Sequence, residues 1–135
     1  MVDWQPISRS AKPEVLGVHP QYANRLDVVI PLSARPPQEW ERYLVRSYTD
    51  NPHMPWFREG VTPAPRVEGV SVRIAPLDDE LESWIKGVDG RIEEANEFYE
   101  RVVLPELRAR EEAERKAQHE REQRVDEARR RAEEL

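Results

Sequence analysis

The chain of 135 residues contains no cysteine, which excludes disulfide bonds, thiolate metal sites and cysteine nucleophiles. Glycine is scarce, with five residues, and neither a glycine-rich phosphate loop nor a G-x-S-x-G motif occurs. The three histidines, His19, His53 and His119, lie in separate segments, and none has a second histidine at a metal-ligand helical spacing. We therefore expect no enzyme activity, no cofactor and no metal site.

Long apolar runs are also absent. No stretch approaches the ~20 apolar residues of a membrane-spanning helix, and the first residues lack the apolar core of a signal peptide. We therefore expect a soluble, cytoplasmic protein that does not bind a membrane. Charged residues make up 36% of the chain, but their signs are mixed and the net charge is -6. Because there is no basic field of single sign, nucleic acid is not an expected partner.

The distribution of proline divides the chain. Eleven of the twelve prolines lie within the first 76 residues, and only Pro105 follows. Because proline interrupts helices and sheet interiors, the first part must consist of short elements, whereas the second is free to be helical. The sequence predicts a flexible N-terminal arm over 1–13, a small α+β domain over 14–107 and a charged helical tail over 108–135 that extends the last helix.

Two apolar segments predict the main strands. Residues 26–32 are β-branched and apolar, and residues 67–75 alternate between apolar and polar side chains. Residues 15–18 add a possible short edge strand. Apolar spacing predicts helices over 37–48 and from residue 78 onward.

The order β-α-β-α indicates a small two- to three-stranded sheet packed by two helices, with a very long charged C-terminal helix. The side chains expected to be most buried are those on the apolar sides of these elements, namely Trp40, Leu44, Val70, Val72, Ile74, Ile85, Val88 and Ile92.

An apolar stripe follows the long helix. At about 100° per residue, large side chains from Leu81 to Leu107 fall in one sector. Smaller side chains continue the stripe through the tail, namely Ala113, Ala117, Val125, Ala128, Ala132 and Leu135. Two interpretations stay open: a solvated spacer held by i,i+4 ion pairs, or a seat for another helix from a second copy or a partner. A conventional leucine-zipper coiled coil is disfavoured, since charged residues such as Arg121 would occupy core positions.

The connection over 49–66 contains four prolines and a cluster of side chains typical of interfaces. The cluster consists of His53, Met54, Trp56, Phe57 and Arg58. Prolines on either side would hold these residues preformed, at low entropic cost for binding. The competing interpretation is that Trp56 and Phe57 fold back to complete the small core.

Together these patterns predict a non-enzymatic protein-protein interaction module, an assembly component, adaptor or inhibitor. It would act through the C-terminal helix and the aromatic loop, on a protein partner or as a homo-oligomer. The alternative is a ligand- or nucleic-acid-binding α+β domain that uses arginines around the sheet, namely Arg25, Arg35, Arg66 and Arg73. Clustering of these arginines on one exposed sheet face would favour the alternative, and dispersal would favour the module.

Overall fold

The computed structural model describes residues 3–46 and 63–135. The chain divides into two compact units, one formed by Gln5–Tyr99 and the other by Met1–Trp4 with Glu100–Leu135. The elements follow in the order β1 (Glu14–Val18), β2 (Leu26–Pro31), α1 (Gln38–Val45), β3 (Arg66–Glu68), β4 (Ser71–Ile74), the 3-10 turn η1 (Asp78–Glu80), α2 (Leu81–Phe98), the π turn η2 (Tyr99–Val103) and α3 (Leu104–Glu133).

The sheet has four antiparallel strands in the order β1-β2-β4-β3, whereas two or three were expected. The additional strand arises because the alternating stretch is a hairpin rather than one strand. Gly69 has φ 60, a left-handed conformation that favours glycine and lets the chain reverse. Val70 lies in this turn with 56% of its surface exposed, so its expected place in the core was wrong. The alternation of apolar and polar residues in the sequence continues through the turn, so it does not distinguish the hairpin from one strand.

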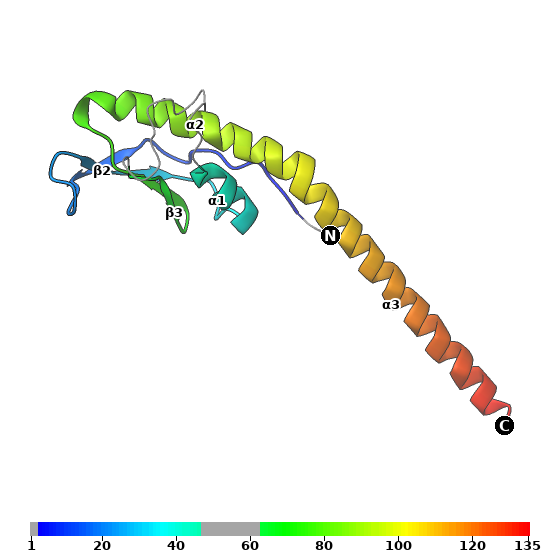
Figure 1. Ribbon diagram of the computed structural model, residues 1–135. Coiled ribbons are helices and arrows are strands. Elements are labelled where there is room, and N and C mark those ends of the chain that lie inside the picture. The colour runs from blue at the N-terminus through cyan, green and yellow to red at the C-terminus, as the bar shows by residue number, and fades with distance from the viewer. Residues whose placement is uncertain (1–2, 47–62) are drawn as a thin grey trace. The chain divides into compact units, whose positions relative to one another are not determined.

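One face of the sheet carries the core. Val28 and Ile30 of β2 lie opposite Ile74 and Val72 of β4, and all four side chains are buried. Helix α2 runs along the sheet (Figure 1). Six of the eight expected core residues are confirmed as buried: Trp40, Leu44, Val72, Ile74, Val88 and Ile92.

The apolar face of α2 is centred differently from the expected one. Ile85 is only partly buried, whereas its neighbour Trp84 is fully buried. Trp84 shares a helical face with Val88 and Ala95, which are also buried. The larger side chain at 84 therefore occupies the core in place of Ile85.

The segment expected to be a flexible arm contains one core residue, Ile7, which is 3% exposed. The Asn96 side chain of α2 forms hydrogen bonds with the backbone of Ile7. Asn96 Oδ1 accepts hydrogen bonds from Ile7 N (3.0 Å) and from Trp40 Nε1 (2.9 Å), and Nδ2 donates to Ile7 O (2.8 Å). Further along, Ser10 N donates to Pro31 O at 3.0 Å, which ties the segment to the end of β2.

Helical turns continue without a break from Asp78 through the end of α3, a length of 56 residues. The π turn η2 interrupts the regular α-helical spacing within this length. It directly precedes Pro105, which lies in the first turn of α3 and lacks the N–H that would bond to Arg101 O. The π turn spans the boundary between the two units, so the stripe of α3 is described within its own unit. The continuity of the stripe from Leu81 to Leu135 stays a prediction.

The placement of Ile92 in the core can be tested by truncation. We expect Ile92→Ala to lower the free energy of unfolding by ~2 to 5 kcal/mol, because it leaves a cavity in a closed site. Ile85→Ala is the matched control on the same helix and should cost less, since Ile85 already contacts solvent. Denaturant melts of both variants measure the difference, and a loss below about 1 kcal/mol for Ile92→Ala would contradict this packing.

Candidate functional site

The five predicted loop residues, His53, Met54, Trp56, Phe57 and Arg58, lie outside the described residues. Their assignment to a partner site therefore stays a prediction. The described chain ends at Arg46 on one side of this segment and resumes at Pro63 on the other.

A buried arginine fixes the backbone where that segment begins. Arg91 of α2 is 1% exposed, and its guanidinium reaches the C-terminal end of α1. Its Nε donates to Leu44 O at 2.7 Å, and its Nη2 donates to Tyr43 O at 2.6 Å and also to Arg46 O. A cation there binds the carbonyls at the helix C-terminus, of which Tyr43 O also accepts a hydrogen bond from Arg46 N at 3.4 Å, and it complements the helix dipole.

The electrostatics of Arg91 follow from this position. Burial lowers the pKa of Arg91, and the neighbouring Glu94 carboxylate acts in the opposite direction. An arginine stays charged under any such shift, so the guanidinium remains a permanent cation under the helix end. Sequence reasoning missed Arg91 because a single arginine within an amphipathic helix looks like a surface residue.

The predicted residues of the tail lie on α3 and at its end. Ala113, Val125, Ala128, Ala132 and Leu135 are exposed, and Ala117 is partly buried. No side chain from Pro105 to Leu135 is buried. Side-chain ion pairs accompany the stripe: Glu106 with Arg110 (3.5 Å), Glu112 with Arg115, and Asp126 with Arg129 (3.8 Å).

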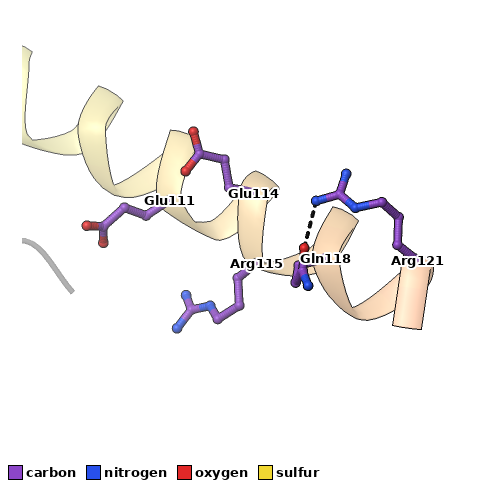
Figure 2. Close-up of a pocket in the computed structure, with 5 residues that line it drawn as sticks. All are labelled: Glu111, Glu114, Arg115, Gln118 and Arg121. Atoms are coloured by element: carbon purple, nitrogen blue, oxygen red, sulfur yellow. Dashed lines mark hydrogen bonds between the residues drawn. The ribbon is translucent and has the colours of Figure 1, made fainter. Parts of the chain in front are cut away.

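The side chains along α3 do not form a ligand cavity. Figure 2 shows Glu111, Glu114, Arg115, Gln118 and Arg121 around a shallow depression on this single helix. Arg121 Nη2 donates to Gln118 Oε1 at 2.9 Å. All of the described residues that line the depression belong to one helix, so it is open to water, unlike the concave sites that bind small molecules.

The arginines of the sheet are only partly clustered. Arg66 and Arg73 are cross-strand partners, and Arg25 Nη1 donates to Ala75 O at 2.9 Å. Arg73 Nη2 lies 2.7 Å from both carboxylate oxygens of Asp27, and its Nη1 lies 3.3 Å from Glu68. The pKa of Arg73 is raised, chiefly by the hydrogen bond to Asp27.

The carboxylates paired with these arginines neutralise their positive charge. Arg66 also binds Glu68, at 3.2 Å, so two arginines face two carboxylates. Arg35 is exposed and lies outside the strands. A phosphate would have to displace carboxylates that Arg73 already binds with good geometry. The arrangement therefore weakens the case for an anion site at the sheet.

Edge strand β1 is a feature that the sequence only hinted at. All five of its residues are exposed, including Val15 (49%), Leu16 (51%) and Val18 (64%). β1 pairs with β2 along one edge, and no described strand pairs with the other. Natural sheets usually protect such edges with charges, short strands or bulges, so three exposed apolar residues there are notable.

Among the described residues no group of His, Asp and Glu could hold a metal ion, and no helix is long and apolar enough to cross a membrane. A comparison of the chain with protein-family models, with curated proteins and with solved structures finds no match.

The role of Arg91 can be tested with a variant that keeps its apolar stem. We expect Arg91→Met to lower the free energy of unfolding by ~2 to 4 kcal/mol, because three backbone carbonyls lose a charged donor. Amide exchange at the end of α1 should accelerate as well. Arg42→Met, an exposed residue of α1, is the matched control. Urea melts that place both variants within about 0.5 kcal/mol of each other would contradict a structural role for Arg91.

Proposed function

We propose that the protein is a non-enzymatic protein-protein interaction module, which binds a partner or a second copy through its C-terminal helix. The observation that supports this is the exposure of α3, a helix of 30 residues in which Leu104 alone is buried. An interaction role also fits the aromatic loop from His53 to Arg58, which we propose as a second contact. Assembly component, adaptor and inhibitor are the roles consistent with such a module.

The stability of an isolated helix explains why α3 is a plausible binding element. Ion pairs at i,i+3 and i,i+4 contribute only ~0.2 to 0.5 kcal/mol each, which favours the helix without giving it a packing partner. Val125, 48% exposed, and the alanines near it leave a narrow apolar strip between charged side chains. Small side chains allow a second helix to approach closely, and the flanking charges can select its orientation.

The alternative function, a ligand- or nucleic-acid-binding sheet, receives less support. Arg66 and Arg73 share one sheet face, as that alternative requires, but Asp27 and Glu68 already bind them. Nonspecific nucleic-acid binding depends on cations that are available to phosphate. A sheet face whose arginines are paired with carboxylates offers little of this attraction.

A charge placed on the stripe tests the proposal. We expect Ala113→Glu/Ala128→Glu to raise the dissociation constant of the assembly at least about tenfold, because carboxylates would be buried against the partner. His119→Glu/Gln123→Glu is the matched control, which introduces the same two acidic side chains on the opposite side of α3. Sedimentation velocity measures self-association, and mass analysis of the co-purifying protein measures partner binding.

Two outcomes of this experiment contradict the proposal. One is an equal effect of the stripe and control variants, which would assign the effect to net charge. The other is a full chain that stays monomeric, captures no protein and exchanges its α3 amides freely. Circular dichroism of each variant shows whether the helix itself has been retained.

The loop is tested with one aromatic substitution. We expect Trp56→Ala to weaken partner binding by at least ~2 kcal/mol while costing little stability, as for an interface hot spot. Tyr22→Ala, which removes an exposed aromatic ring elsewhere, is the control. A loss of ~3 to 5 kcal/mol in the free energy of unfolding, without a binding defect in the folded fraction, would instead assign Trp56 to the core.

A further inference from the structure

Strand β1 carries a second interaction surface, separate from α3 and from the aromatic loop. Its pairing with β2 contains a bulge: Val15 lies opposite Val28 and Gly17 opposite Asp27, which leaves Leu16 as an extra residue. Gly17 has φ 146, a conformation that L side chains rarely adopt, so glycine permits this irregularity.

The bulge brings two valines to the same face of the sheet. Val15 opposes Val28, and Val18 opposes Leu26. The two valines are three positions apart on β1, whereas their partners are two positions apart on β2 and therefore lie on one face. Val28 is fully buried, because its face forms the core. Val15 and Val18 therefore belong to the row of core-facing side chains, yet they remain about half exposed or more. The described residues therefore leave the core face of the sheet exposed at β1.

We propose that the outer edge of β1 pairs antiparallel with β1 of a second copy, in a two-fold register centred between Leu16 and Gly17. In this register Val15 lies opposite Val18 of the other copy, and both lie on the core-facing side. A bulge faces an identical bulge, so the number of residues between the valines matches on the two strands. A regular strand from another protein would lack this match, which is why we assign a second copy as the occupant.

Polar side chains on the opposite face can form hydrogen bonds with each other in the same register. Glu14 lies opposite His19 of the other copy, and both fall on the side of the sheet away from the core. His19 Nδ1 accepts a hydrogen bond from Gln21 N at 3.0 Å, so the neutral imidazole carries its proton on Nε2. That N–H can donate to the Glu14 carboxylate of the other copy. The two-fold axis makes this contact twice.

The area buried between the two β1 strands determines how tight a dimer we expect. A pair of five-residue strands covers less than the ~1,200 Å² that specific, stable interfaces bury. Pro13 and Pro20 flank the strand and cannot donate to a longer ladder. We therefore expect a weak dimer, visible at high protein concentration.

Cysteine cross-linking of the full chain tests the register, because the sequence contains no cysteine of its own. A mixture of Val15→Cys and Val18→Cys chains should form covalent dimers at least about tenfold faster than either variant alone. In the proposed register the two introduced thiols lie opposite each other, whereas identical positions are about 10 Å apart along the strands. Val70→Cys, an exposed site in the β3-β4 turn, measures random collision.

A second measurement uses sedimentation equilibrium. We expect Val15→Lys/Val18→Lys to raise the dimer dissociation constant at least about tenfold, while Val70→Lys leaves it unchanged. Because these valines are exposed, the melting temperature should stay close to that of the parent chain. Equal cross-linking rates in the mixture and in the single variants would overturn the proposal, and so would a full chain without any β1-dependent dimer.

The two proposals can fail separately. Cross-linking between positions 15 and 18 reports on β1 alone, so its absence leaves binding through α3 untouched. Conversely, the α3 stripe variant should leave this cross-link intact.

Discussion

The side-chain amide of Asn96 is the contact on which the unit Gln5–Tyr99 depends. An amide is both donor and acceptor, so this one group satisfies Ile7 N, Ile7 O and the Trp40 indole. It thereby joins the N-terminal segment, α1 and α2. A carboxylate could not donate to Ile7 O, and an apolar side chain would leave three polar groups without their partner. Arg91, five residues earlier on α2, adds a second polar contact to α1.

The buried side chains of this small core cover only part of the sheet. Helices α1 and α2 contribute Trp40, Leu44, Trp84, Val88 and Ile92, which bury the central strands β2 and β4. No helix of the described chain buries β1 in this way, and the paired arginines make the opposite face of the sheet partly polar. Among the described residues, apolar surface therefore remains exposed at the sheet edge and on α3. Both proposed interaction surfaces have this common origin.

Periodicity and proline placement were enough to predict the α+β class, the helices and six of eight core residues. Errors arose where one pattern fits two structures. The alternation across Val70 is the same for a strand and for a hairpin, and only the conformation of Gly69 distinguishes them. Asn96 and Arg91 could not be predicted, because their roles depend on backbone groups distant in sequence. The candidate site remains partly a prediction: the tail residues are exposed, and the loop residues lie outside the described chain.

The bulge in β1 has a consequence for how this strand can vary. Gly17 has φ 146, which L side chains rarely adopt, although no heavy atom of the described residues lies within 4 Å of the position that a Cβ would take. Another residue at position 17 would therefore meet backbone strain rather than a steric clash, and the strand would relax toward regular pairing. Because regular pairing alternates the faces, it would turn Val15 or Val18 away from the core side, so one glycine decides whether the two valines share a face.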